Sequence, residues 1–274
     1  MDPEYHLRLG AKSGKQGYAL QSAMLSVIII TKNEAQNLGA CLDSVAELAG
    51  EIVVVDSGST DATRDIARSH GAMLVETADW PGFGPQKNRA LDAASREWVL
   101  SLDADERLTP ELAEEIRQVL AAPGQTSCFA LPRLSWYCGR FMRHSGWCPD
   151  YVDRLFRRGS ARFSDDKIHE RLLPDGPTAR LTKYLLHYSF RDFSSVLKKV
   201  DAYSTASAEV AYARGKRSSV WGALGHGLWA FIRTYVFKAG FLDGSQGLAL
   251  AISNAEGSYY RYLKIWLMQQ GQSK

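Results

Sequence analysis

The stretch Trp98-Val-Leu-Ser-Leu-Asp-Ala-Asp-Glu106 joins an apolar run to two closely spaced carboxylates. The run predicts a buried strand, and Asp103 and Asp105 stand where that strand should stop. Residues i and i+2 of an extended chain point to the same side, so the two carboxylates can converge on one object. Mg²⁺ prefers such oxygen ligands, usually one or two carboxylates plus substrate phosphates. The same pattern also fits an acidic turn that caps a helix beginning near Thr109.

Short apolar runs alternate with helical patterns on the N-terminal side of this stretch. The predicted strands are Leu25–Thr31, Glu51–Val55, Ala72–Glu76 and Trp98–Leu102, and the predicted helices are Ala62–His70, Gln86–Ser95 and a segment around Leu38–Val45. Such alternation predicts an α/β fold whose sheet is mostly parallel, with right-handed crossovers. Ligands of these sheets bind outside the carboxyl ends of the strands.

Polar residues gather at these predicted carboxyl ends. Thr31-Lys-Asn-Glu34 follows the first strand, Asp56-Ser-Gly58 follows the second, and Asp103 and Asp105 follow the fourth. Because parallel strands end at one edge of a sheet, we expect these groups to line one ligand site. This concurrence favours a functional interpretation of the two aspartates over a capping one.

The composition is that of a globular protein with one large domain, or with one domain and an appendage. The chain has 274 residues, of which 45% are apolar. Its four cysteines include no C-x-x-C pair, which favours a reducing compartment. Residues 1–23 are polar and lack periodicity, so we interpret them as a disordered leader or the product of an upstream start codon.

Four segments, in this order and spacing, resemble the inverting family 2 glycosyltransferases of the GT-A fold. They are Ser26-Val-Ile-Ile-Ile-Thr-Lys-Asn-Glu34, Val53-Val-Val-Asp-Ser-Gly-Ser-Thr-Asp61, Gln86-Lys-Asn-Arg-Ala90 and Leu102-Asp-Ala-Asp-Glu106. The resemblance implies a nucleotide-diphospho-sugar transferase domain over residues 24–190. Residues 191–274 would then form a helical, basic C-terminal extension.

A second resemblance points to a subgroup that adds glucose to the inner-core heptose of bacterial lipopolysaccharide. It rests on Trp147-Cys-Pro-Asp-Tyr-Val-Asp-Arg-Leu-Phe-Arg-Arg158 with Ile168-His-Glu170, and on Lys238-Ala-Gly-Phe-Leu-Asp-Gly244. It implies metal-dependent transfer, with inversion, of a sugar (expected to be glucose) from a UDP-sugar to a lipopolysaccharide core heptose or similar glycan. The alternatives are transfer to another cell-surface polysaccharide or glycolipid, and a non-catalytic glycan- or membrane-binding module.

The resemblance also implies where the nucleoside of the donor would lie. Asp56 corresponds to the acid that binds the uracil or ribose of a UDP-sugar in this family. The region of Thr31, Asn33 and Glu34 would border the base. A purely structural role for Asp56, as a turn residue that caps a helix, is the alternative.

The charged end of the donor is assigned in the same way. Lys87 and Arg89 would lie near the nucleotide, and Asp103 and Asp105 would form the motif that binds Mg²⁺ or Mn²⁺. Such an ion bridges a diphosphate and offsets charge as the sugar departs. For Lys87 and Arg89 the structural alternative is a solvated helix face.

Inverting transfer also needs a base that takes the proton of the acceptor hydroxyl. The resemblance places it downstream of the metal motif, although the Glu-Asp pair usual in the family is missing here. We favour Glu170 because it follows His169, which would be an additional metal or phosphate contact or else a packed core histidine. Asp150 is the second candidate, with acceptor binding as its other role. Arg154 would meet the phosphates of a charged acceptor or be solvated at the surface.

The C-terminal part of the chain is basic and contains an aromatic, amphipathic stretch. Between Lys198 and Lys274 there are ten Lys or Arg and four Asp or Glu, a net charge of +6. Large apolar residues recur at helical spacing over 219–242 but fall short of the ~20 residues that span a bilayer. A helix of this kind can lie in a membrane interface, or it can pack as ordinary core. We expect a cytoplasmic protein, peripheral on the inner membrane, without a nucleic-acid polymer as partner.

Two other enzyme classes lack the loop that they need. A sugar nucleotidyltransferase requires a glycine-rich basic loop after the first strand, and a Rossmann dehydrogenase requires G-x-G-x-x-G at that turn. Thr31–Asn37 contains no glycine. A non-catalytic module predicts a damaged metal motif, whereas both aspartates are intact.

Overall fold

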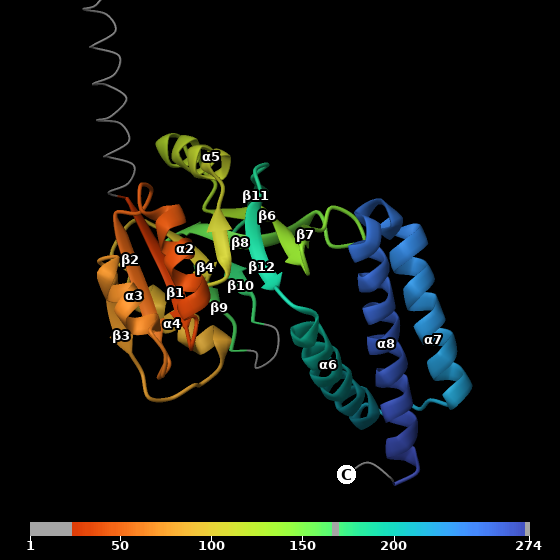
Figure 1. Cartoon of the computed structure of the whole chain (residues 1–274). Coiled ribbons are helices and arrows are strands. Elements are labelled where there is room, and N and C mark those ends of the chain that lie inside the picture. The colour runs from red at the N-terminus through yellow and green to blue at the C-terminus, as the bar shows by residue number, and fades with distance from the viewer. Residues whose placement is uncertain (1–23, 166–169, 272–274) are drawn as a thin grey trace, which may run out of the picture. The chain divides into compact units, whose positions relative to one another are not determined.

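The structure is a computed structural model that describes residues 24–165 and 170–271. These residues divide into two compact units (Figure 1). The sheet unit contains residues 24–133, 151–165 and 170–187, and the helical unit contains residues 134–150 and 188–271. The predicted leader, residues 1–23, and the predicted metal contact His169 lie outside the described residues.

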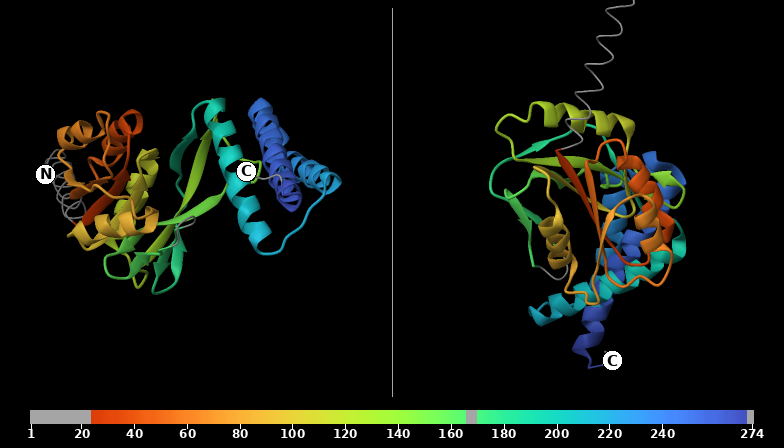
Figure 2. Two further views of the ribbon diagram at one scale, coloured as in Figure 1. Left: turned by 90° about the horizontal axis from the view of Figure 1, so that it is seen from below. Right: turned by 90° about the vertical axis from the view of Figure 1, so that its left-hand side faces the viewer.

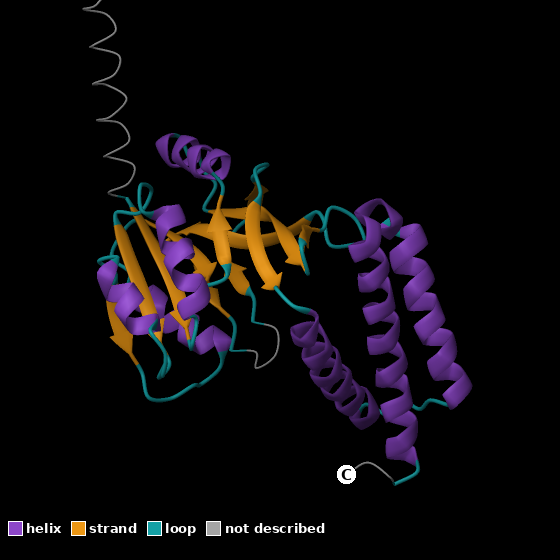
Figure 3. Ribbon diagram, in the orientation of Figure 1, coloured by secondary structure: helices purple, strands orange, loops and turns teal. Residues whose placement is uncertain are grey.

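The first half of the sheet unit alternates strands and helices as the sequence predicted. Its elements are β1 (Leu25–Thr31), α2 (Ala35–Val45), β2 (Glu51–Asp56), α3 (Thr63–Ser69), β3 (Met73–Glu76), α4 (Phe83–Ala93) and β4 (Trp98–Asp103). The strands are all parallel, in the order β3-β2-β1-β4. Figure 3 shows these strands with helices on both sides.

The central strand β1 is buried along its whole length because both of its faces are covered. Val27 and Ile29 pack in one apolar cluster with the α2 residue Leu38. Ile28 and Ile30 pack in a second cluster that includes residues of α4. The continuous apolar run of β1 therefore reflects two cores, one on each side of the sheet.

Helix α4 begins three residues before its predicted start at Gln86. The extra turn contains Gly84 and Pro85, which precede the predicted start. Proline is tolerated in a first helical turn because the first four N–H groups of a helix have no partner within it. Gly84 and Pro85 therefore lie in the first turn of this helix and not in the segment before it.

The second half of the sheet unit adds antiparallel pairs. Its elements are β5 (Glu106–Leu108), α5 (Pro110–Ala121), β6 (Cys128–Tyr137), β8 (Asp150–Arg157), β9 (Ala161–Phe163), β10 (Leu172–Pro174), β11 (Thr178–Arg180) and β12 (Leu185–Phe190). Residues 134–137 of β6, residue 150 of β8 and residues 188–190 of β12 group with the helical unit. Strand β8 is antiparallel to β4, and β12 is antiparallel to β5. The Thr109 hydroxyl caps α5 by accepting the Leu112 N–H at 3.1 Å. The start of this helix therefore does not use Asp103 or Asp105.

The helical unit is built around one long helix. Its elements are β7 (Arg140–Phe141), α6 (Phe193–Ala213), α7 (Val220–Ile232), the π-helical turn η1 (Arg233–Phe237), the 3₁₀ turn η2 (Gly240–Asp243) and α8 (Gly244–Gln269). Helices α6 and α7 both pack on α8, which lies between them (Figure 2). Within residues 24–165 and 170–271, no helix combines the length and apolar character needed to cross a membrane. The predicted α/β class with a helical C-terminal extension is confirmed.

Candidate active site

Three of the predicted site residues end neighbouring parallel strands. Thr31 ends β1, Asp56 ends β2 and Asp103 ends β4. The strand register pairs Thr31 with Asp56 and pairs Ile30 of β1 with Asp103. Their side chains therefore share the carboxyl edge of the sheet, which is where α/β proteins bind ligands.

Asp103 is held by two cations from distant parts of the chain. Lys87 of α4 places its Nζ 3.0 Å from Asp103 Oδ1, and Arg154 of β8 places a guanidinium nitrogen 2.5 Å from Oδ2. Arg154 also contacts Oε1 of the buried Glu106 at 2.7 Å. Burial by itself would raise the pKa of Asp103, but the charges of Arg154 and Lys87 outweigh it and hold that pKa well below its usual range. Asp103 is therefore a carboxylate at any pH near neutrality.

Lys87 connects the metal-motif aspartate to the predicted base. Its Nζ lies 3.0 Å from Glu170 Oε1 as well as 3.0 Å from Asp103 Oδ1. Gly84, one turn earlier in α4, makes this approach possible. A Cβ at that position would lie 1.8 Å from the Ser164 carbonyl oxygen and 3.5 Å from the Glu170 Cβ. The absence of a side chain at Gly84 thus lets α4 approach the segment that contains Glu170.

Asp105 has a different partner from Asp103. It lies in the turn between β4 and β5, so the alternation of the strand does not extend to it. Its Oδ2 is 3.4 Å from Nε2 of His187, which β12 places opposite Glu106 of β5. His187 and Glu106 carried no predicted role. No local sequence pattern identified the strand that His187 joins, because its pairing with Glu106 is long-range.

Asp56 is fully buried and organises the loop that follows β2. Its Oδ1 accepts the N–H groups of Gly58 and Ser59 at 3.1 and 2.8 Å. Its Oδ2 accepts the Thr31 hydroxyl at 3.0 Å and the Ser59 hydroxyl in a short hydrogen bond. A carboxylate has about four acceptor positions, and four protein donors use them here. Asp56 therefore fixes this loop, whatever else it contacts.

Asn33 and Glu34 tie the loop after β1 to the loop after β2. Asn33 has a left-handed backbone, with φ of 57°, and its N–H donates to the Ser59 hydroxyl at 2.8 Å. Its side-chain oxygen accepts the Thr60 N–H at 2.8 Å. The Glu34 N–H donates to the Thr63 hydroxyl at 2.8 Å. The two loops thus form one hydrogen-bonded rim beside Asp56.

Arg89 is not part of the Asp103 network. Arg89 forms a bidentate pair with Asp79, at 2.7 and 2.8 Å, and its side chain is 38% exposed. Such an exposed pair contributes little to stability. Asp150 opens β8 and groups with the helical unit, whereas Glu170 belongs to the sheet unit.

The chain is similar to known sugar-transferring proteins over most of its length. The family model of glycosyl transferase family 2 matches residues 26–199. The lipopolysaccharide core biosynthesis glycosyltransferase LpsC of Rhizobium meliloti is 31% identical over 256 residues, which are 87% of this chain and 93% of LpsC. An uncharacterized glycosyltransferase of Rickettsia prowazekii is 27% identical over 88% of this chain and 86% of its own length.

Among solved structures, glucosyl-3-phosphoglycerate synthase of Mycobacterium tuberculosis, crystallised with Mn²⁺, UDP and glucosyl-3-phosphoglycerate, is 26% identical. The match covers 43% of this chain and 47% of that one, with a TM-score of 0.37. The expected GT-A fold is confirmed by the family match together with the parallel β3-β2-β1-β4 arrangement. Since the family model spans more than half of the chain and the strand-end residues occupy the edge that binds ligands, the protein belongs to glycosyl transferase family 2.

Proposed function

We propose that the protein transfers glucose, with inversion, from UDP-glucose to a heptose of the lipopolysaccharide core or to a similar glycan. The observation that carries the proposal is the contact of Lys87 with both Asp103 and Glu170 at the carboxyl edge of the parallel strands. Through this contact, the same Lys87 amine holds both Asp103, which is suited to binding the donor's metal, and Glu170, which is suited to removing a proton. The similarity to LpsC, a lipopolysaccharide core enzyme by name, supports this class of acceptor.

The donor set at this edge fits a divalent metal. Asp103 and Asp105 supply carboxylate oxygens, and their side chains are 33% and 28% exposed, so a ligand can reach them. Mg²⁺ and Mn²⁺ accept such oxygens together with phosphate oxygens. When bound, the ion would neutralise charge on the diphosphate. Arg154 and Glu106 contact Asp103, and His187 contacts Asp105, so both proposed metal ligands are oriented by neighbouring protein groups.

We assign the protein's own residues to three tasks. Asp56 and the rim of Thr31, Asn33 and Glu34 shape the place for the uracil and ribose. Glu170 takes the proton of the acceptor hydroxyl, and Lys87 orients it. Arg154 is only 6% exposed and contacts two carboxylates, so we assign it to holding Asp103 instead of to acceptor phosphates.

The reaction can be tested directly with purified protein. UDP-glucose, Mn²⁺ or Mg²⁺ and a heptose-containing core oligosaccharide should give a product one hexose heavier by mass spectrometry, with a β-linkage by NMR. Other UDP-sugars and a heptose-free acceptor serve as controls. A β-linked product on a different glycan would redirect the acceptor assignment. Glycan binding without consumption of any UDP-sugar would favour the binding-module alternative.

Replacing Asp56 with alanine should weaken UDP binding. Four protein donors already use the acceptor positions of Asp56, so the loss would act through the rim that these hydrogen bonds hold, and we expect roughly a tenfold or larger loss of affinity by calorimetry. The substitution removes the acceptor for Gly58, Ser59 and Thr31, which should loosen the rim. Asp65→Ala on α3 is the matched control because that carboxylate is 85% exposed. Unchanged UDP affinity would leave Asp56 with a purely structural role.

We further propose that the helical unit binds a membrane surface peripherally, on the cytoplasmic face of the inner membrane. Helix α7 buries its small residues Ala223 and Gly227 and exposes five large ones, namely Val220, Trp221, Leu224, Leu228 and Trp229. A Cβ on Gly227 would lie 3.1 Å from Tyr259 Cβ, so close packing on α8 uses this side. Trp221 is 82% exposed and Leu228 is 63% exposed. Exposed apolar patches of this kind mark interaction surfaces, which favours the membrane interface over a stripe buried as core.

Binding to anionic vesicles should exceed binding to neutral vesicles and should weaken with salt. Each basic residue near an anionic surface contributes about 1 kcal/mol. The exposed residues Arg214, Lys216 and Arg217 lie just before α7, and their replacement by glutamate should release the protein from vesicles in a sedimentation assay. Transfer to a soluble acceptor should persist in this triple variant. Equal partitioning of the variant and the wild type would contradict the proposal.

A further inference from the structure

Three cavities of the helical unit meet at Arg261 on α8. One of about 350 Å³ lies along α6 and α8, one of about 600 Å³ lies along α7 and α8, and one of about 500 Å³ borders residues 210–216. Their linings include basic side chains but no aspartate or glutamate. The basic residues are Lys199, Arg214, Lys216, Arg233, Lys238 and Arg261.

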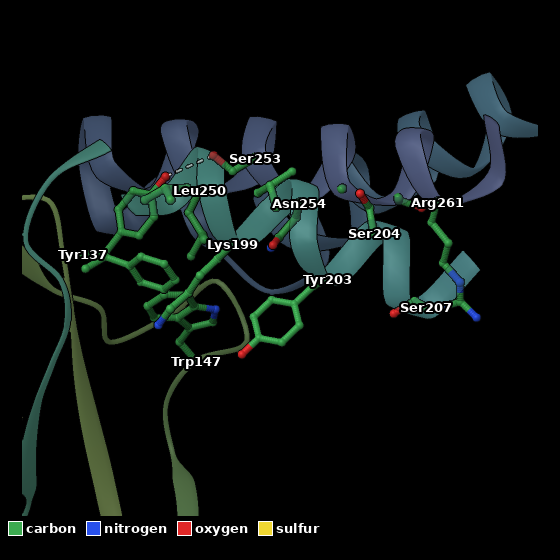
Figure 4. Close-up of a pocket in the computed structure, with 15 residues that line it drawn as sticks. Tyr137, Trp147, Lys199, Tyr203, Ser204, Ser207, Leu250, Ser253, Asn254 and Arg261 are labelled. Carbon is green, nitrogen blue, oxygen red and sulfur yellow. Dashed lines mark hydrogen bonds between the residues drawn. The ribbon is translucent and has the colours of Figure 1, made fainter. Parts of the chain in front are cut away.

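The cavity of about 600 Å³ combines cations with aromatic walls. Its basic residues are Arg233, Lys238 and Arg261, and its aromatic rings are those of Trp147, Trp229, Tyr262 and His226, which stacks on Tyr262. Asn254 and Ser258 of α8 add polar groups. Figure 4 shows Trp147, Asn254 and Arg261 from the neighbouring cavity, which shares them.

The cations of this cavity have no anionic partner among the described residues. Arg261 makes no side-chain hydrogen bond or ion pair in residues 24–165 and 170–271, and its Nε is buried without an acceptor. Its guanidinium stands 5.6 Å from the Tyr262 ring centre. Arg233 and Lys238 likewise form no ion pair within that part of the chain. The Nε of Arg261 is buried without a counter-charge, which is costly for a cation, and Arg233 and Lys238 are exposed and accessible, so this arrangement favours an anionic ligand.

The backbone around the cavity is fixed by the segment Lys238–Gly244, part of the resemblance to the lipopolysaccharide-core subgroup. Asp243 is fully buried and accepts the N–H groups of Arg143 and His144 at 3.1 and 3.0 Å. It also accepts the Ser145 hydroxyl at 3.0 Å, and the Ser145 N–H donates to the Lys238 carbonyl at 2.8 Å. The loop that bears Trp147 is thereby held against the cationic residues.

The π-helical turn η1 brings two of the cations together. The Lys238 N–H donates to the Arg233 carbonyl at 2.9 Å, which closes a turn of five residues. Turns of this type are rare and frequent at functional sites. The same turn exposes Phe237, at 68%, and the wall residue Trp229 is 54% exposed. An apolar surface therefore borders the basic cavity.

We propose that this cavity binds the phosphate headgroup of an anionic lipid, with the phosphate among Arg233, Lys238 and Arg261 and the acyl chains against Trp229 and Phe237. This site goes beyond the diffuse attraction of residues 214–217 to a bilayer, because it recognises one headgroup at fixed cations. It is independent of the transferase reaction, since binding requires neither UDP-sugar nor metal.

The probe is dihexanoyl phosphatidic acid below its micellar concentration, titrated into the full chain without UDP-sugar or metal and followed by calorimetry. We expect saturable binding that falls about tenfold or more in Arg233→Gln and in Arg261→Gln, because each removes a charge-assisted hydrogen bond. Lys198→Gln is the matched control, since it removes one charge from α6 outside the cavity lining. Dihexanoyl phosphatidylcholine should bind at least tenfold more weakly than the phosphatidic acid.

Two results would overturn the proposal. Equal loss in Lys198→Gln and in the cavity variants would reduce the effect to overall charge. Binding of inorganic phosphate or glycerol phosphate as tightly as the short-chain lipid would make this a site for a soluble phosphate. Circular dichroism and thermal unfolding check that Arg261→Gln folds. If it does not, Arg233→Gln still tests the proposal, because Arg233 is exposed and its replacement should not disturb the fold.

Discussion

Replacing Asp105 with alanine should abolish sugar transfer while the protein remains folded. Asp105 supplies a carboxylate to the proposed metal, and its partly exposed side chain lies 3.4 Å from His187. Loss of a metal ligand costs several kcal/mol in the transition state, so turnover should fall about 10³-fold or more. The measurement is initial rate with UDP-glucose and acceptor over a range of Mn²⁺ and Mg²⁺ concentrations.

Asp103→Ala should be equally inactive but less stable. It leaves Lys87, 3% exposed, and Arg154, 6% exposed, with fewer compensating charges. Removing one partner of a buried ion pair costs about 3–5 kcal/mol, which denaturant unfolding would detect. Asp92→Ala is the matched control because Asp92 pairs with Arg162 at an exposed site. Near-normal turnover of both site variants, with or without EDTA, would disprove the metal assignment.

The depressed pKa of Asp103 sets the pH window of this ion-pair network. A carboxyl group whose folded pKa lies below its unfolded value, near 4, stabilises the folded state above that value. This contribution is lost only as the pH falls below about 4 toward the folded pKa. An acid limb of the rate profile above about pH 5 therefore cannot come from protonation of Asp103.

Glu170→Gln should lower turnover about 10²–10⁴-fold and leave UDP-sugar affinity nearly unchanged. The glutamine keeps the shape of the side chain, and its oxygen can still accept from Lys87, but it cannot take a proton at the reacting hydroxyl. Steady-state rates and calorimetry with UDP would separate the two effects.

The matched comparison is Asp150→Asn, the other predicted base. Asp150 belongs to the helical unit, whereas Glu170 contacts a cation that also contacts Asp103. We therefore expect Asp150→Asn to retain most of its turnover. An active Glu170→Gln together with an inactive Asp150→Asn would show that the base has been assigned to the wrong carboxylate.

The sequence by itself determined the parallel half of the sheet and the edge that carries the site. Each strand is a short apolar run, and the polar residues of the site follow it directly in the sequence. Both can therefore be recognised from neighbouring residues alone. The apolar run of β1 is readable because both faces of that strand are buried. Because parallel strands end at the same edge of a sheet, Thr31, Asp56 and Asp103 lie at one edge once the strands are parallel.

Only the tertiary structure decided which charges meet. Lys87 reaches Glu170 across 83 positions of sequence, and Arg154 reaches Asp103 across 51. Such partners depend on how α4 and β8 pack, and on Gly84 allowing a close approach, which no local periodicity encodes. Asp105 lies in a turn and pairs with His187, and this pairing likewise depends on long-range packing that the local sequence does not encode.

In the helical unit, too, the sequence predicted a helix but only the tertiary structure decided how it packs. Periodicity predicted α7 but could not say which of its faces would be buried, since a large apolar stripe usually packs as core. The structure buries the small face of Ala223 and Gly227 on α8, because close helix contact favours residues without bulk. That packing exposes Trp221 and Leu228, and it turns a predicted amphipathic helix into a candidate membrane surface.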